Sequence, residues 1–574
     1  MDEGIKKFKL TRNLVFIAFF IILLSSLRLQ IIEGKKYYRL SEKNRIRQRY
    51  IPAARGKIFD RRGAEIANTR PGFYVSAIQS LIDEKTLRHI ATILDIDEER
   101  IREKLRMEKN PFMAVKIAHD IRYEQLSVIE EGMDLLKGIE VGVEPLRNYP
   151  YKELFCHLIG YVGEITDNEI SKGKDYKADD YIGRMGLEEY CEGQLKGTDG
   201  VEYIEVDARG RELGKIAEKR PLPAITGKNI HTTIDLPLSE SVAVYLEDFD
   251  NAACVCLDPQ NGEILVLYSK PGFDPNHFVH GLQKKEWQIL HNRPDAPMYN
   301  RAIMSCYPCG STFKPFVALA ALDSKMITPK KSFTPCSGKY RLGRRVFRCW
   351  KRHGWLELID AIVYSCDIYF YQLGAFVGVD TIVSRTREIG FGRKTNIDLP
   401  GEKAGFLPDR TWFESHYGDN WTLGHVFNLS VGQGDLLVTP LQVACTYTIF
   451  ANDGKIPLPH VIKRDDYEYR ETAISQEALD IVEEALRGVV SSGTGTLANV
   501  ENFDVCGKTG TAQNPHGEDH SLFVGYAPRS DPQILVCVFV ENAGHGGSVA
   551  APIAGKIFRA FLQLNTGSGY VQEN

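Results

Sequence analysis

One apolar segment near the N-terminus constrains the architecture of this chain more than any other feature. Residues 14–32 carry Arg28 as their single charge, and their length is close to the roughly 20 residues that a helix needs to span a bilayer. No later segment is as long and as apolar. The sequence therefore predicts a single-pass protein of the cytoplasmic membrane, with a short cytoplasmic tail and everything after residue 33 outside the cytoplasm, in the periplasm. Basic residues before the span favour this orientation, although others follow it: Lys6, Lys7, Lys9 and Arg12 before, Lys35, Lys36 and Arg39 after.

A cleaved signal peptide is the alternative interpretation of this segment. Its end, residues 24–30, holds no Ala-x-Ala-like cleavage site, which favours an uncleaved anchor. The rest of the chain is long enough for two or three domains, because it has 574 residues. Its formal net charge of -4 gives no electrostatic reason to expect nucleic acid as a partner.

Strand-like runs stand at both ends of the C-terminal half. Residues 252–257 and 263–268 are separated by a turn-like segment, and residues 521–527 and 533–541 form a similar pair. A long stretch at 311–490 lies between them and is mostly helical in pattern. This order predicts an α+β domain whose antiparallel sheet is closed by its two termini and flanked by helices.

A serine and a lysine one helical turn apart stand at the start of an apolar helical run. Ser311 follows Gly310, Lys314 comes three residues later, and Pro315 fits the first turn of a helix. A serine hydroxyl needs a neighbouring base to become a nucleophile, and a partly desolvated lysine can supply one. Alone, the pair more often marks an N-cap serine and a surface lysine than a catalytic site.

Two further segments strengthen the interpretation of Ser311 as a nucleophile. Ser365 and Asp367 supply a second hydroxyl and a carboxylate at a helix start. Residues 508–512 precede the strand at 521–527 and contribute a cation, two hydroxyls and a glycine: Lys508, Thr509, Gly510 and Thr511. The order matches the Ser-x-x-Lys, Ser-x-Asn and Lys-Thr-Gly set of penicillin-binding proteins and serine β-lactamases.

Over nearly its whole length the chain resembles the class B penicillin-binding proteins, most closely the cell-elongation branch called penicillin-binding protein two. Residues 55–61, 186–190 and 207–210 are similar to motifs of the family's N-terminal pedestal. Asp367 stands where division-type relatives usually carry Asn. The resemblance implies five parts: a cytoplasmic tail at 1–13, a transmembrane anchor at 14–32, a non-catalytic, dimerisation-type pedestal at 33–229, a transpeptidase domain of the β-lactamase-like fold at 230–565, and a tail at 566–574. We also expect the charged segment 50–63 to form a solvated hairpin.

The resemblance implies a peptidoglycan D,D-transpeptidase that β-lactams inhibit. In it, Ser311 would attack the D-alanyl-D-alanine carbonyl of a stem peptide, Lys314 would act as general base, and Ser365 would relay the proton. The backbone amides of Ser311 and Thr511 would form the oxyanion hole, and Lys508, Thr509 and Thr511 would hold the substrate carboxylate. Alternatives with the same fold are a β-lactamase, a D,D-carboxypeptidase and a non-catalytic β-lactam sensor.

The resemblance also implies partners. They are a RodA-type glycan polymerase and other membrane proteins of the elongation complex, reached through the anchor and the pedestal. The alternative is that the pedestal is a passive spacer.

Four further side chains fit a structural zinc site. Zinc prefers four nitrogen or sulfur ligands, and the candidates form a Cys₃His set: Cys336, Cys349, His353 and Cys366. Some elongation-type relatives carry a metal at these positions. The alternatives are buried thiols, a Cys336–Cys349 disulfide, or competition from Cys306 and Cys309, which could pair with each other; Cys309 stands where the family usually has Pro. Catalysis itself is expected to need no cofactor.

Overall fold

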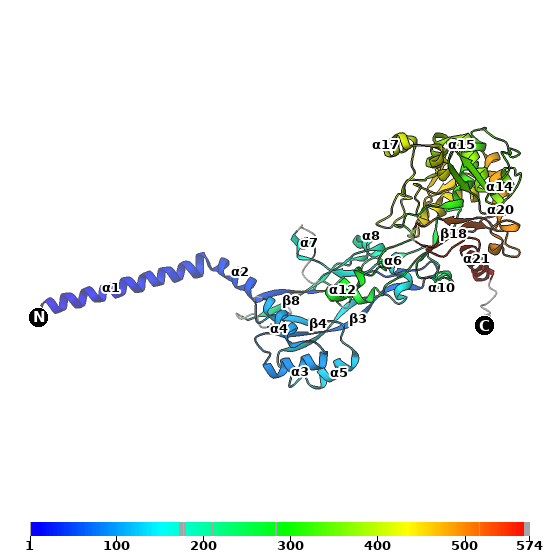
Figure 1. Ribbon diagram of the computed structural model, residues 1–574. Helices are drawn as coiled ribbons and strands as arrows, with labels where there is room; N and C mark the ends of the chain where they lie inside the picture. Colours follow the sequence, from blue (N-terminus) through cyan, green and yellow to red (C-terminus); the bar gives the residue numbers. More distant parts are fainter. Residues whose placement is uncertain are drawn as a thin grey trace. The chain divides into compact units, whose positions relative to one another are not determined.

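The computed structural model describes residues 2–108, 110–171, 176, 180–207, 212–216, 219–279, 281, 284–515 and 517–566 (Figure 1). The chain forms two compact units. The first comprises residues 1–55, 70–146 and 196–227, and the second comprises 56–69, 147–195 and 228–574. Three residues of one pedestal motif, 208–210, and the tail from 567 lie outside the described residues.

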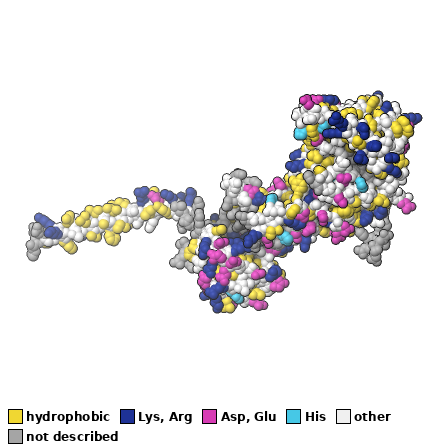
Figure 2. Space-filling model, in the orientation of Figure 1, with side chains coloured by type: hydrophobic (Ala, Val, Ile, Leu, Met, Phe, Trp, Pro, Cys, Tyr) yellow, Lys and Arg dark blue, Asp and Glu magenta, His cyan; other side chains and the backbone are white. Residues whose placement is uncertain are grey.

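The N-terminal segment is one long helix. Helix α1 (Asp2–Leu27) continues into the π-helical turn η1 (Arg28–Ile32). Apolar side chains cover the face of this helix seen in Figure 2, with basic ones near its ends. Phe16, Phe19 and Ile22 are each more than half exposed. In the described part of the chain, Gly4–Ile32 is the one helix long and apolar enough to cross a membrane, as the sequence predicted.

The first unit contains two small antiparallel sheets. In one, β1 (Ile46–Ile51), which follows α2 (Gly34–Arg45), pairs with β8 (Gly200–Val206), and β8 pairs with β9 (Glu212–Lys215). In the other, residues 70–78 of β3 (Glu65–Ile78) pair with β4 (Ala114–Ala118) and β5 (Ile139–Asn148). Apolar side chains of this sheet pack against three amphipathic helices: α3 (Glu84–Leu94), α4 (Glu98–Met107) and α5 (Tyr123–Glu131).

The second unit begins with a buried turn. Strand β2 (Ile58–Phe59) pairs with the first residues of β3 and with β10 (Ile230–His231). The turn between β2 and β3 forms around Asp60, whose carboxylate accepts hydrogen bonds from the backbone N–H groups of Arg62 (2.9 Å) and Ala64 (2.7 Å). The predicted hairpin forms, but it is not solvated at Asp60, because this side chain is almost fully buried where these donors replace water.

Short elements complete this part of the unit. A fully buried ion pair joins two of its segments, since Arg147 Nε donates to Glu188 Oε1 over 2.5 Å. The elements are η2 (Lys152–Phe155), α6 (Cys156–Ile159), β6 (Val162–Glu164), α7 (Asp167–Ser171), β7 (Tyr181–Gly183), α8 (Gly186–Tyr190) and α9 (Glu192–Leu195).

A five-stranded antiparallel sheet organises the rest of the second unit. Its order is β12 (Ile264–Lys270), β11 (Ala252–Leu257), β19 (Ile534–Val540), β18 (His520–Ala527) and β17 (Cys506–Ala512). Strands from both ends of the domain meet at its centre, where Val255 lies opposite Cys537. Helices α10 (Leu236–Tyr245) and α21 (Ala550–Thr566) cover one face, and α19 (Pro440–Ala451) packs on the same central strands from the other (Figure 1). The predicted α+β class is confirmed.

The stretch between the outer strands is less uniformly helical than the sequence suggested. Two hairpins interrupt it: β13 (Lys339–Leu342) with β14 (Arg345–Arg348), and β15 (Lys455–Pro457) with β16 (Tyr469–Glu471). The remaining elements are α11 (Asn276–Val279), α12 (Lys284–His291), η3 (Gly310–Phe313), α13 (Lys314–Asp323), α14 (Leu358–Val363), α15 (Asp367–Val377), α16 (Val379–Ile389), α17 (Arg410–Tyr417), η4 (Gly418–Asn420), α18 (Leu423–Ser430), α20 (Gln476–Ser491) and η5 (Thr496–Ala498).

Candidate active site

Ser311 lies in a tight 3-10 turn directly before helix α13. The turn is pressed between two other segments. A Cβ atom on Gly310, whose φ is +53°, would come within 2.5 Å of the Thr511 carbonyl oxygen on β17. The Gly310 N–H donates to the Gly432 carbonyl oxygen over 2.8 Å. Only glycine fits at 310, so the turn holds Ser311 next to the sheet edge.

Lys314 is fully buried and has three acceptors around its ammonium group. Its Nζ donates to Ser365 Oγ (3.1 Å), to the Ser365 carbonyl oxygen (2.8 Å) and to Asp367 Oδ1 (2.7 Å). These contacts use all three ammonium donors. Burial raises the pKa of Asp367, while the Lys314 charge acts in the opposite direction. The structure thus brings together the lysine, the hydroxyl and the carboxylate that the sequence singled out.

Ser365 precedes the helix that the sequence predicted it to begin or enter. It lies between α14 and α15 with φ of +53°, which is uncommon for a residue with a Cβ atom. The Cys366 N–H donates a hydrogen bond to the Ala361 carbonyl oxygen over 2.9 Å, and α15 begins at Asp367. This sharp turn directs the Ser365 and Asp367 side chains toward Lys314.

The Lys508–Thr511 segment forms most of strand β17, at the edge of the sheet. Lys508 is fully buried; burial, and to a lesser extent the nearby Lys314, lowers its pKa well below the ordinary value. Thr509 and Thr494 share a 2.7 Å hydrogen bond between their hydroxyls. Gln433 Nε2 donates to the Thr511 carbonyl oxygen over 2.8 Å. An edge strand offers unpaired backbone groups to which an extended peptide can add.

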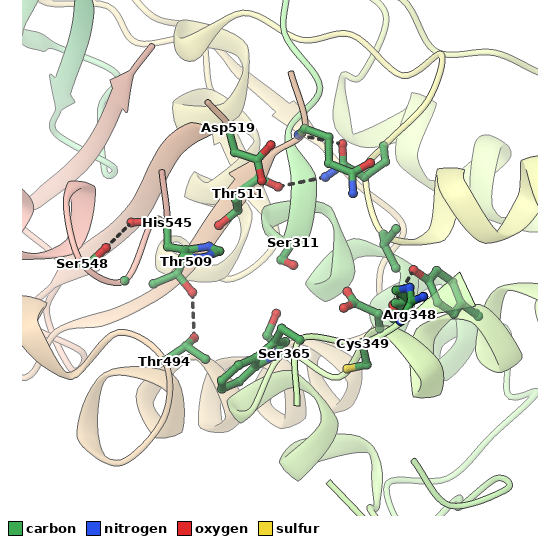
Figure 3. Close-up of a pocket in the computed structure, with 17 residues that line it drawn as sticks. Ser311, Arg348, Cys349, Ser365, Thr494, Thr509, Thr511, Asp519, His545 and Ser548 are labelled. Carbon is green, nitrogen blue, oxygen red and sulfur yellow. Dashed lines mark hydrogen bonds between the residues drawn. The ribbon is translucent and has the colours of Figure 1, made fainter. Parts of the chain in front are cut away.

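Several of these side chains, although not the buried Lys314 and Lys508, line one cleft of about 630 Å³ (Figure 3). Ser311, Ser365, Thr509 and Thr511 line it, together with residues that the sequence had not marked as site residues. Thr494 lies in a Ser- and Gly-rich loop and Gln433 lies between two glycines, so neither stands out in the sequence as a site residue. Others come from chain-distant segments, Arg348 from β14 and Tyr371 from α15, and have no local signature: Arg348, Trp350, Tyr371, Asp519 and His545.

The four predicted zinc ligands also meet. The ligand atoms of Cys336, Cys349, His353 and Cys366 all lie within 4.8 Å of one another. Nδ1 of His353 is 3.6 Å from the Cys336 sulfur and 3.5 Å from the Cys349 sulfur. All twelve cysteines, each within the described residues, are free thiols, so neither alternative disulfide is formed.

Comparisons with known proteins agree with this geometry. Residues 252–559 match the penicillin binding protein transpeptidase domain, and residues 50–232 match the penicillin-binding protein dimerisation domain. The peptidoglycan D,D-transpeptidase MrdA of Acinetobacter baumannii is 33% identical, over 96% of this chain and 86% of that protein.

Two solved structures have the same fold. The complex between PBP2 and MreC from Helicobacter pylori matches with 25% identity and a TM-score of 0.81, over 91% of this chain and 100% of that one. A chain from a study of polymerization and crosslinking by a peptidoglycan synthase complex matches with 27% identity and a TM-score of 0.74, over 99% and 100%.

The fold and the arrangement around Ser311 define a serine acyl-transferase of the penicillin-binding class. The chain belongs to the class B penicillin-binding proteins and, within them, to the peptidoglycan D,D-transpeptidases of the cell-elongation branch.

Proposed function

We propose that Ser311 is the nucleophile that this transpeptidase uses to cross-link stem peptides, with Lys314 as its general base and Ser365 as its proton relay. The observation that carries the assignment is the buried Lys314, held by Ser365 and Asp367 one turn after Ser311. A fully buried lysine is unfavourable unless its ammonium is paired, so its place beside the cleft argues for a chemical role.

In the proposed cycle, Ser311 Oγ gives its proton to Lys314, in its neutral form, and bonds to the carbonyl carbon of the penultimate D-alanine. The bond from that carbon to the nitrogen of the terminal D-alanine breaks, and Ser365 passes the proton to the leaving amine. An acceptor amine then attacks the ester and loses a proton to Lys314, and Ser311 Oγ leaves reprotonated. The amides of Ser311 and Thr511 stabilise the oxyanion, while Lys508, Thr509 and Thr511 hold the terminal carboxylate and Gly510 lets the peptide approach.

Product analysis tests this function. The full chain is incubated with a peptide ending in D-Ala-D-Ala, with and without an acceptor amine, and products are separated by mass. We expect a new amide-linked dimer that requires the acceptor. Hydrolysis alone, unaffected by the amine, would indicate a carboxypeptidase or β-lactamase. Stable acylation by β-lactams without turnover of any peptide would indicate a sensor.

We also propose a structural zinc ion bound by Cys336, Cys349, His353 and Cys366. Bond lengths of about 2.3 Å to sulfur and 2.0–2.1 Å to nitrogen set tetrahedral S···N edges of about 3.6 Å. The two sulfur–nitrogen separations of 3.6 and 3.5 Å fit that value. Bound there, zinc would hold the 336–353 loop against the start of α15 without entering the reaction. The zinc content of protein purified without added metal tests this proposal. Less than about a tenth of an equivalent of zinc per chain would contradict it.

The anchor and the pedestal support a location and a set of partners. We propose the bounds predicted above, with a single span at 14–32 in the cytoplasmic membrane and the catalytic domain in the periplasm. The solved relative bound to MreC and the synthase-complex structure support a role in an elongation complex with a RodA-type polymerase. Co-purification of the polymerase that survives removal of both anchor and pedestal would place the partner surface elsewhere.

A further inference from the structure

The hairpin formed by β13 and β14 carries an unusual concentration of positive charge. Residues 339–352 include seven basic side chains and no acidic one. All seven are exposed to solvent. We call this set the basic rim: Lys339, Arg341, Arg344, Arg345, Arg348, Lys351 and Arg352. Within the described residues, none of these side chains forms an ion pair.

Aromatic side chains on one face of the hairpin hold it in place. Tyr340 and Phe347 are cross-strand partners, and both rings pack on Phe427, with centroids 5.8 and 5.0 Å away. Phe347 also contacts Tyr371 at 5.4 Å. This aromatic cluster anchors the hairpin to α18 and α15, so the fold does not need the charges of the opposite face.

The opposite face carries charge at a cost to stability. Lys339 lies directly across from Arg348, and Arg341 lies across from Val346. Like charges directly opposite on paired strands are destabilising. Positive charge kept in such a pair, with no acidic neighbour, indicates that the compensating anion belongs to a ligand.

The position of the rim indicates which ligand supplies the anion. Arg348 and Trp350 line the same cleft as Ser311, so one end of the rim borders the active site, as the positions of Arg348 and Ser311 in Figure 3 show. Strand β14 is four residues long, about 13 Å, which matches about four residues of an extended peptide. A peptide whose D-Ala-D-Ala end is at Ser311 has its preceding residues within reach of this surface.

We propose that the basic rim binds side-chain carboxylates of the stem peptide and thereby selects an acidic peptide as substrate. The proposal rests on the assignment of Ser311 as the nucleophile. The rim contributes affinity rather than chemistry, since its charges do not contact the reacting atoms, and its contribution falls as salt rises.

Competition against a fluorescent penicillin tests the proposal with the full chain in detergent. The probes are a pentapeptide that ends in D-Ala-D-Ala and carries a glutamate side chain, the same peptide with that side chain amidated, and poly-glutamate. The test variant is Lys339→Gln/Arg341→Gln/Arg348→Gln. The matched control, Lys394→Gln/Lys455→Gln/Lys463→Gln, removes the same number of exposed charges elsewhere in the second unit.

We expect the acidic peptide to compete about two- to fivefold better than the amidated one at low salt, as one exposed charge pair would allow. The test variant should lose this difference and the control should keep it. Equal competition by the two peptides in the unmodified chain would overturn the proposal. So would equal potency of poly-glutamate, which would make the rim a general polyanion surface. If the unmodified chain is not acylated at all, the assignment of Ser311 fails instead.

Discussion

The floor and the rim of the cleft both carry positive charge, but in opposite physical states. On the floor, Lys314 and Lys508 are fully buried, and Lys314 is surrounded by acceptors from Ser365 and Asp367. On the rim, Arg345 and Arg348 are exposed and have no acidic partner in the described structure.

This difference separates two uses of a cation. A buried lysine has weak contact with water, so its protonation state responds to neighbouring groups and it can move a proton. An exposed arginine stays charged and is screened by salt, so it can attract an anion but cannot act as a base. Substitution of Lys314 should therefore abolish chemistry, whereas substitutions of Lys508 and of the rim should alter affinity.

The largest expected effect follows from Lys314→Ala. The variant lacks the base and the contact that Lys314 makes with Ser365, so penicillin should acylate Ser311 roughly a thousandfold more slowly. Stopped-flow or gel-based labelling measures this rate, with Lys325→Ala, two residues beyond the end of α13, as the control. A fall of less than tenfold in a folded Lys314→Ala protein would remove lysine from the role of base.

Lys508→Met distinguishes binding from proton transfer on the floor. Methionine fills similar volume but cannot hold a carboxylate, so the penicillin concentration for half-maximal acylation rate should rise about ten- to a hundredfold.

The lowered pKa of Lys508 also makes the stability of the chain depend on pH. The folded chain releases this proton at a pH below the 10.5 of the unfolded chain, so stability gains with rising pH between the two values.

Thermal unfolding of Lys508→Met between pH 7.5 and 10 checks that sign. The stability of the variant should rise less with pH than that of the unmodified chain, because the variant lacks the contribution of Lys508. A steeper rise of stability with pH in the variant would contradict the assignment of a buried, readily deprotonated lysine.

Ser365 offers a smaller effect that separates geometry from chemistry. Because its φ is +53°, Ser365→Gly should be more stable than Ser365→Ala by about 1 kcal/mol. Both variants lack the hydroxyl, so both should slow acylation by a similar factor, roughly ten- to a hundredfold. Chemical denaturation and penicillin labelling measure the two quantities. Full activity in the glycine variant would show that the hydroxyl is not the relay.

The smallest expected effect lies on the rim. Lys339→Gln removes the repulsion with Arg348 and should leave stability unchanged or raise it by about 0.2–0.5 kcal/mol. Arg410→Gln, which breaks an exposed ion pair with Asp380, is the comparison and should lower stability slightly. A loss of more than about 1 kcal/mol in Lys339→Gln would mean that the rim is part of the fold.

The sequence predicted that Lys314 meets Ser365 and Asp367 and that four possible zinc ligands cluster, because each prediction depends on residue types at short, recognisable spacings. It also predicted the sheet, since alternating apolar runs mark strands independently of their partners. It could not predict the left-handed turn at Ser365, the burial of Asp60, or the contact of Gln433 with Thr511. These depend on where chain-distant segments meet. The basic run at 339–352 was visible in the sequence, but its place beside the cleft was not.

The site of acylation tests the central claim most directly. Intact-mass measurement of the full chain after reaction with a penicillin, followed by peptide mapping, locates the covalent adduct. The account predicts one adduct per chain, on Ser311, and none in a folded Ser311→Ala protein. An adduct on any other residue, or persistent labelling of folded Ser311→Ala, would contradict it.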